Sequence, residues 1–214
     1  MQGEMDADSA TIQRIAETLQ RSMLQVPPDG RFPRLQVETL YEADPNESDL
    51  GGDFFDAFAL SEERVALVVG DVSGKGLFAA ARTTEVKYAL RAFLHEHQAP
   101  EIALARLNNF ICKTHRLDAD SGETFIILAL VVVDTVTGNT TLSSAGAEPT
   151  LILRLDGTAE QVTIIGLPLD LHGGIEEHWK RSGKAPRPCV EICSKRAADK
   201  VKSSWQIMVV LLKV

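Results

Sequence analysis

The most informative part of the sequence contains two acidic motifs, Gly51-Gly52-Asp53-Phe54-Phe55-Asp56 and Gly70-Asp71-Val72-Ser73-Gly74-Lys75-Gly76. Residues 64–69, between the motifs, are apolar and partly β-branched and follow a polar turn, which predicts a strand. We therefore expect Asp71 at the end of a buried strand, where a tight glycine turn begins. Asp53 opens the preceding apolar segment. If the two segments form a hairpin, their carboxylates lie close together.

Two close carboxylates repel each other unless a proton or a cation lies between them. Hard divalent ions such as Mg²⁺ and Mn²⁺ favour such oxygen ligands, which makes a metal site one interpretation of the two motifs. Spacing alone also fits ordinary Asp-Gly turns without a metal. A phosphate-binding loop is excluded, because that motif needs four residues between its glycines and Ser or Thr after its lysine. Here three residues separate Gly70 from Gly74, and Gly76 follows Lys75.

The paired motifs resemble the active-site core of the SpoIIE-type phosphatases, a bacterial branch of the metal-dependent PPM Ser/Thr protein phosphatases. Other parts of the family pattern follow in the same order and cover most of residues 15–170, namely Leu19-Gln20-Arg21-Ser22-Met23-Leu24, Asn108-Asn109, Ser144-Ala145-Gly146, Pro149 and Gly166-Leu167-Pro168-Leu169. The resemblance implies an α+β fold with two packed antiparallel β-sheets flanked by helices, an α-β-β-α sandwich. It also implies an N-terminal helical lead-in in residues 1–28 and a phosphatase domain in residues 29–214.

Hydrophobic periodicity agrees with mixed helices and strands. Helices are expected in residues 9–26 and 77–96 and from Pro100 onward. Strands are expected in residues 35–43, 54–60, 64–69, 124–134, 140–145, 150–155, 161–165, 185–193 and 207–214, with a turn at residues 137–139.

In the chemistry that the resemblance implies, two metal ions, Mn or Mg, hold a water molecule, lower its pKa and shield the phosphoryl oxygens. Asp53, Asp71 and the backbone carbonyl of Val72 would be metal ligands in this chain. The Ser73–Gly76 turn would form the rim of the site. The expected substrate is phosphoserine or phosphothreonine in a regulatory protein of the anti-sigma-factor antagonist type, in bacterial signalling or sigma-factor control.

The family pattern is lost after about residue 174. Ser194-Lys195-Arg196 stands where the family has Thr-Asp-Gly, and Trp205-Gln206 stands where it has Asp-Asp. Lys195 would repel a dication, and the Trp205 indole cannot coordinate one. We therefore expect one weak metal site or none and doubtful activity. The alternative is a catalytically inactive pseudophosphatase that acts as a regulatory interaction module, and a truncated or frame-shifted C-terminal quarter is a third explanation.

Composition narrows the other possibilities. A net charge of −8 argues against nucleic acid as the main partner. Three cysteines argue against a disulfide framework and suit the cytoplasm. No run approaches a membrane span. A zinc site from Cys112, His115, Cys189 and Cys193 has spacings unlike a known finger, which favours buried thiols.

The apolar stripe from Ile12 to Met23 must be buried against another surface. A homodimer through the N-terminal helix is one hypothesis. Packing of the helix on its own domain is the other.

Overall fold

The computed structural model describes residues 15, 18, 24, 31–42, 51–117, 124–153, 158–170, 191–194 and 205–212. Its elements in chain order are β1 (Leu35–Glu42), β2 (Gly51–Ala59), β3 (Arg64–Lys75), α2 (Gly76–His97), α3 (Pro100–Leu117), β4 (Ile126–Asp134), β5 (Thr140–Ala145), β6 (Thr150–Leu153), β7 (Ala159–Val162), β8 (Glu191–Ser194) and β9 (Trp205–Leu212). The predicted α+β class is confirmed, and most predicted elements lie within a few residues of their expected bounds.

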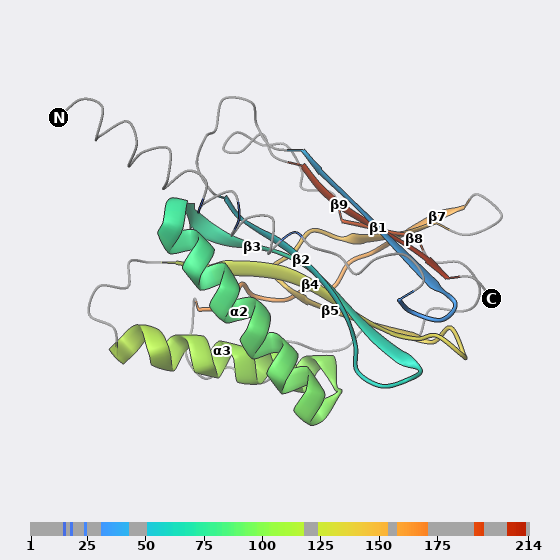
Figure 1. The fold of residues 1–214 in the computed structure, drawn as a ribbon, viewed down its shortest axis with the longest axis horizontal. Helices are drawn as coiled ribbons and strands as arrows, with labels where there is room; N and C mark the ends of the chain where they lie inside the picture. Colours follow the sequence, from blue (N-terminus) through green and yellow to red (C-terminus); the bar gives the residue numbers. More distant parts are fainter. Residues whose placement is uncertain are drawn as a thin grey trace.

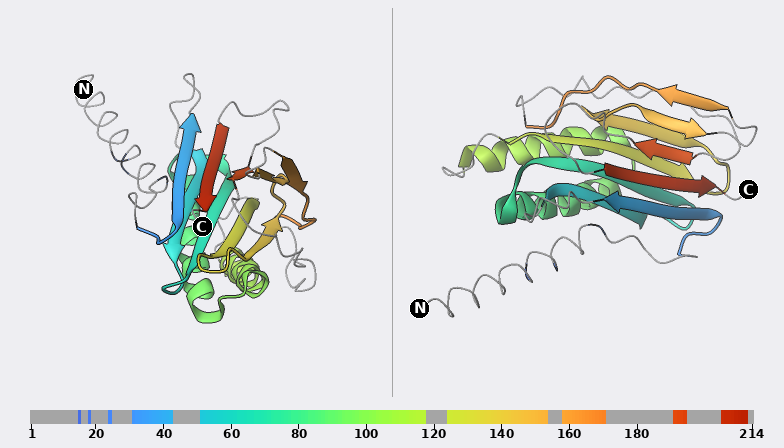
Figure 2. Two further views of the ribbon diagram at one scale, coloured as in Figure 1. Left: turned by 90° about the vertical axis from the view of Figure 1, so that its right-hand side faces the viewer. Right: turned by 90° about the horizontal axis from the view of Figure 1, so that it is seen from above.

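Two layers of antiparallel strands form the centre of the molecule. One is the four-stranded sheet β2-β3-β4-β5. The other contains the pair β1-β9 and the sheet β7-β6-β8, with β8 and β9 in contact. Figure 2 shows these strands as a layer beside the four-stranded sheet. Helices α2 and α3 cover the opposite face of that sheet (Figure 1). The two layers of strands confirm the predicted pair of packed antiparallel sheets.

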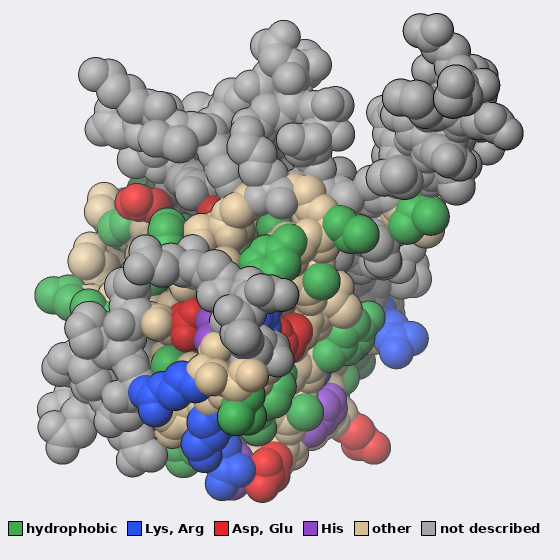
Figure 3. Space-filling model, turned by 90° about the vertical axis from the view of Figure 1, so that its left-hand side faces the viewer, with side chains coloured by type: hydrophobic (Ala, Val, Ile, Leu, Met, Phe, Trp, Pro, Cys, Tyr) green, Lys and Arg blue, Asp and Glu red, His purple; other side chains and the backbone are tan. Residues whose placement is uncertain are grey.

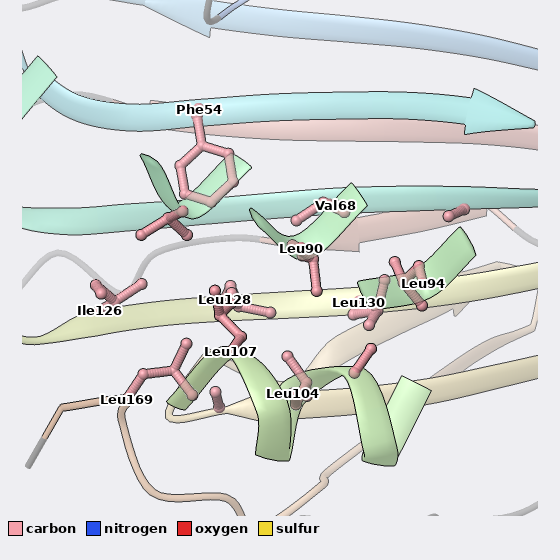
Figure 4. Packing of buried hydrophobic residues seen from close by; sticks show 14 of the residues in the cluster. Phe54, Val68, Leu90, Leu94, Leu104, Leu107, Ile126, Leu128, Leu130 and Leu169 are labelled. Carbon is pink, nitrogen blue, oxygen red and sulfur yellow. The ribbon is translucent and has the colours of Figure 1, made fainter. Parts of the chain in front are cut away.

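Side chains of the four-stranded sheet alternate between two hydrophobic clusters, as the pleat of a strand requires. Phe54 and Val68 lie in the cluster that packs against α2 and α3 (Figure 4). Phe55 and Leu67 lie in the cluster that also contains Leu35 and other residues outside this sheet. Both phenylalanines are almost fully buried, and complete burial of such a side chain stabilises the fold by roughly 1.5–3 kcal/mol.

The third strand is longer than predicted. We expected it to end at Asp71, but β3 continues to Lys75. Strand pairing explains the difference, because β4 supports β3 as far as Val72 and β2 reaches Lys75 through the pair Gly51–Lys75. The glycine turn follows this extension, with positive φ at Gly74 (117°) and Gly76 (74°).

The predicted turn between β4 and β5 is confirmed. Asp134 Oδ1 accepts backbone hydrogen bonds from Val136 at 3.0 Å and from Thr137 at 2.7 Å. Gly138 takes the left-handed conformation, with φ 72°. These bonds lower the pKa of Asp134 below 3.8, the Thr137 amide being the largest cause.

Most of the predicted lead-in helix lies outside the described residues. Ile15 is helical and half exposed, whereas Leu24 packs against the cluster between the sheets. Neither observation tests the dimer hypothesis. Among the residues that the structure describes, no helix is both long enough and apolar enough to span a membrane.

Candidate metal centre

The two aspartates chosen from the sequence lie directly opposite each other. Asp53 of β2 pairs with Asp71 of β3 in the antiparallel register, as the hairpin prediction required. Directly opposed residues of this kind have Cβ atoms about 4.5–5.5 Å apart. Each aspartate is only 6% exposed. The sheet thus holds two carboxylates side by side with little access to water.

Alternation along the strands places both carboxylates on the face of the sheet that is turned toward the second layer. Asp53 is two residues from Phe55, and Asp71 is four residues from Leu67, and both of these apolar residues belong to the cluster between the layers. The candidate centre therefore lies at the end of the space between the two sheets. Figure 3 looks at the end of the molecule where β3 ends and β4 begins, and acidic side chains are visible near its middle, beside a histidine and a basic side chain.

The third predicted ligand, the Val72 carbonyl, lies against Gly52. A Cβ atom built on Gly52 would come within 1.8 Å of the Val72 carbonyl oxygen. The register of β2 against β3 also shifts between Gly51 and Asp53, which is a β-bulge. Glycine is therefore required at position 52 by this close approach of the two backbones. The bulge brings the carbonyl of the residue after Asp71 next to the residue before Asp53.

Two hydrogen bonds join Ser73, near the end of β3, to Phe125, just before β4. Ser73 donates its backbone N–H to the Phe125 carbonyl at 2.9 Å, and its Oγ accepts the Phe125 N–H at 2.9 Å. The following Gly74 is exposed and leads into α2. The predicted role of the Ser73–Gly76 segment as a rim remains a prediction.

Two residues that the family pattern contributed, Asn108 and Leu169, meet beside β4. Leu169 exchanges backbone hydrogen bonds with Ile126, and Asn108 Oδ1 accepts the N–H of Asp170 at 2.9 Å. The Asp170 carboxylate contacts Nδ1 of His115 in α3. Since Ile126 pairs with Val72, these contacts hold the strand beside the candidate centre. The Asp170–His115 contact could not be predicted from the sequence, because no local pattern places these two residues opposite each other.

Of the cysteines considered for zinc and interpreted as buried thiols, only the side chain of Cys112 is described. Cys112 is a buried free thiol whose Sγ lies 3.8 Å from Asn108 Oδ1. Burial, followed by the nearby Asp170 carboxylate, raises the pKa of this thiol. The buried-thiol interpretation is confirmed for Cys112, while Cys189 and the side chain of Cys193 lie outside the described residues.

The positions that replace the family's missing acids are only partly described. Trp205 begins β9 and pairs with Glu42 of β1, but its side chain is not described, and Lys195 lies outside the described residues. The described side chains contain no group of three or more His, Cys, Asp and Glu residues suited to a metal. A site for one ion, formed by Asp53, Asp71 and the Val72 carbonyl, remains a prediction that the direct pairing of the two aspartates agrees with.

Sequence comparison identifies relatives for more than half of the chain. Residues 61–180 match the family model of Stage II sporulation protein E (SpoIIE), a range that includes the second acidic motif. Protein IcfG of Synechocystis sp. is 29% identical over 154 residues. That match covers 61% of this chain and 24% of IcfG, so the chain spans about a quarter of this relative.

Solved structures show the same fold. The RsbU and RsbW domains of Rv1364c from Mycobacterium tuberculosis are 26% identical, with a TM-score of 0.61 over 75% of this chain and 43% of that chain. The PP2C phosphatase domain of SpoIIE from Bacillus subtilis has a TM-score of 0.64 at 16% identity, covering 84% of this chain and 64% of that one. RsbX in complex with magnesium has a TM-score of 0.63 at 14% identity, covering 89% and 100%.

The acidic hairpin, the paired sheets and the match over residues 61–180 agree with one another. The chain belongs to the SpoIIE family and has the fold of the PP2C phosphatase domain of SpoIIE.

Proposed function

We propose that this domain binds one divalent ion weakly, Mn²⁺ or Mg²⁺, through Asp53, Asp71 and the Val72 carbonyl. The observation that carries the proposal is the direct pairing of two buried aspartates on the face between the sheets. Oxygen ligands of this kind suit hard cations. The magnesium complex of RsbX supports a metal in this fold class.

The reaction is hydrolysis of phosphoserine or phosphothreonine in a regulatory protein, in the cytoplasm and in bacterial signalling or sigma-factor control. When bound, metal ions in such a site activate water and neutralise phosphoryl charge. The contribution of this chain is to hold two carboxylates and one carbonyl together at the end of the space between the sheets. Burial of Asp53 and Asp71 restricts water around them, which strengthens their attraction for a cation.

The substrate is a phosphorylated partner protein of the anti-sigma-factor antagonist type. The solved Rv1364c structure joins an RsbU domain to an RsbW domain, which supports a partner in such a pathway.

Activity should be low, because Lys195 and Trp205 stand where the family supplies acids for the second ion. Two-metal catalysis uses both ions to hold the attacking and leaving oxygens. An ion without a complete set of ligands is poorly placed, and a misplacement of about 1 Å can cost on the order of a hundredfold in rate.

Hydrolysis of a small aryl phosphate and of a phosphoserine peptide, with excess Mn²⁺, tests the proposal. The expected result is slow, Mn²⁺-dependent turnover that Asp71→Asn abolishes and that Glu62→Gln, a change on an exposed turn, leaves unchanged. Turnover of roughly 1 s⁻¹ or more that Asp71→Asn abolishes would show that other groups replace the missing acids. No turnover at any Mn²⁺ concentration would favour the inactive interaction module.

A further inference from the structure

A line of polar side chains on α2 contacts β2, which is one of the two outer strands of the four-stranded sheet in the described chain. Thr83, Lys87 and Arg91 lie four residues apart, so they share one face of the helix. The Thr83 hydroxyl lies 3.1 Å from the Gly52 carbonyl oxygen and 2.9 Å from an acceptor in its own helix. Lys87 Nζ donates to the Phe55 carbonyl at 3.0 Å. We call Thr83, Lys87 and Arg91 the α2 seam.

The seam also engages Asp56, the second carboxylate of the first acidic motif. Asp56 lies on the helix-facing side of β2 and is 1% exposed. Arg91 Nε and Nη2 donate to its two oxygens at 2.6 Å and 2.5 Å, and Lys87 Nζ lies 3.8 Å from Oδ1. The Arg91 guanidinium also stacks over the Phe58 ring, 4.8 Å from its centroid. Asp56 therefore anchors α2 and lies on the opposite face of the sheet from Asp53.

The buried charges of Lys87 and Asp56, together with the charge of Arg91, restrict how α2 can dock on β2. Burial lowers the pKa of Lys87, and the Asp56 carboxylate opposes that shift. The hydrogen bond to Asp56 raises the pKa of Arg91. A buried charge without partners is costly, so the helix can dock in this position only when these partners face each other.

The seam contacts lie on both sides of Asp53 along β2. Gly52 precedes it, and Phe55 and Asp56 follow it. An outer strand is held by a neighbouring strand on one side only, so its free side depends on other contacts. Here β3 holds one side of β2, and side chains of α2 bond to its carbonyl groups.

We propose that Thr83 and Lys87 are positioning residues that hold β2 in place, so that Asp53 stays opposite Asp71. The effect on metal binding rests on the proposed function. The effect on the backbone of β2 does not, and the two can be measured separately.

Hydrogen exchange of the full chain, followed by mass spectrometry, tests the backbone effect. Thr83→Val keeps the shape of the side chain but removes the donor to Gly52. Thr84→Val is the matched control, because the Thr84 hydroxyl bonds to the Ala80 carbonyl of its own helix at 2.9 Å. The expected result is exchange roughly tenfold faster in residues 51–59 of Thr83→Val, since a buried acceptor has lost its partner. Residues 126–134 should be unchanged in both variants.

Lys87→Met is the second variant in the same measurement, because it removes the donor to Phe55 and leaves Asp56 paired with Arg91. Faster exchange confined to β2 in either variant supports the proposal. Unchanged exchange in both variants overturns it, as does equal acceleration in β2 and in the central strand β4, which would show a loss of overall stability only.

Calorimetry with Mn²⁺ then tests the link to the metal. We expect Thr83→Val and Lys87→Met to weaken Mn²⁺ binding roughly tenfold, as changes behind a metal ligand typically do, with Thr84→Val unchanged. Unchanged Mn²⁺ affinity in both variants would overturn the link. A wild-type chain that binds no Mn²⁺ would overturn the proposed function, and the exchange result would still decide the role of the seam.

Discussion

Replacement of Gly52 by alanine tests the close approach of β2 and β3 at the candidate centre. The added Cβ would lie 1.8 Å from the Val72 carbonyl oxygen and 2.7 Å from its carbonyl carbon, whereas ordinary contact begins at 3.4 Å. Both neighbours are backbone atoms, so no side chain can rotate away. The strands must separate locally by about 1.5 Å, which lengthens a hydrogen bond of typical length, about 2.9 Å, beyond its useful range.

The free energy of unfolding should fall accordingly. Overpacking of a tight site costs typically 1–3 kcal/mol, and a lost hydrogen bond adds about 0.5–1.5 kcal/mol. Alanine also lowers the conformational entropy of the unfolded chain, which offsets about 0.4–1 kcal/mol of this loss. The midpoints of these ranges leave a net loss of roughly 2–3 kcal/mol, which lowers Tm by roughly 4–12 °C for a chain of this size.

Gly76→Ala is the matched control, because its cost has a different cause. A Cβ at position 76 meets nothing within 4 Å, but the backbone has φ 74°. The left-handed conformation costs a non-glycine residue roughly 1–2 kcal/mol, and the stiffer unfolded chain offsets part of that cost. Thermal unfolding followed by circular dichroism should therefore show a clearly larger Tm loss for Gly52→Ala. An equal or larger loss for Gly76→Ala, or a wild-type Tm for Gly52→Ala, would refute this account of the site.

Three other changes give independent tests. Asp134→Ala removes the acceptor for two backbone N–H groups of the β4–β5 turn, so we expect a loss of about 1 kcal/mol in denaturant unfolding, and a loss near zero would contradict that role. Burial raises the pKa of the Cys112 thiol above 9.0, so the folded state holds the thiol proton more tightly than the unfolded state does. The free energy of unfolding should therefore fall as the pH rises from 9.0 through the pKa of the folded state. Cys112→Ala should remove that part of the pH dependence, and an unchanged dependence would contradict it. If the N-terminal helix forms a dimer, light scattering should show a dimer for the full chain and a monomer for a chain that starts after Pro28. A full chain that is also monomeric would exclude that dimer.

The hairpin and the face of its two aspartates could be predicted because they depend on local pattern. The apolar run before Asp71 indicated a strand, and strand alternation then set which residues share a face. The length of β3 could not be predicted in this way, since pairing with β2 and β4 carries the strand through Gly70 and Gly74. Glycines inside a motif look like a turn until the partner strands are known.

The contacts of Asp56 with α2 could not be predicted from the sequence either. It belongs to the same motif as Asp53, yet its partners Lys87 and Arg91 lie 31 and 35 residues later, on a helix. Their four-residue spacing predicts a shared helix face but says nothing of the strand that this face meets. The Asp170–His115 pair has the same origin, because it depends on how a loop folds back onto α3.

Calorimetric titration of the purified chain with Mn²⁺ tests the central claim most directly. The account predicts about one weak site per chain, because two carboxylates and one carbonyl suit a single ion. Asp71→Asn should abolish that binding, and Glu62→Gln should leave it unchanged. Two tight sites in the wild-type chain, or binding that persists in Asp71→Asn, would contradict the assignment of Asp53 and Asp71 as the ligands of one ion.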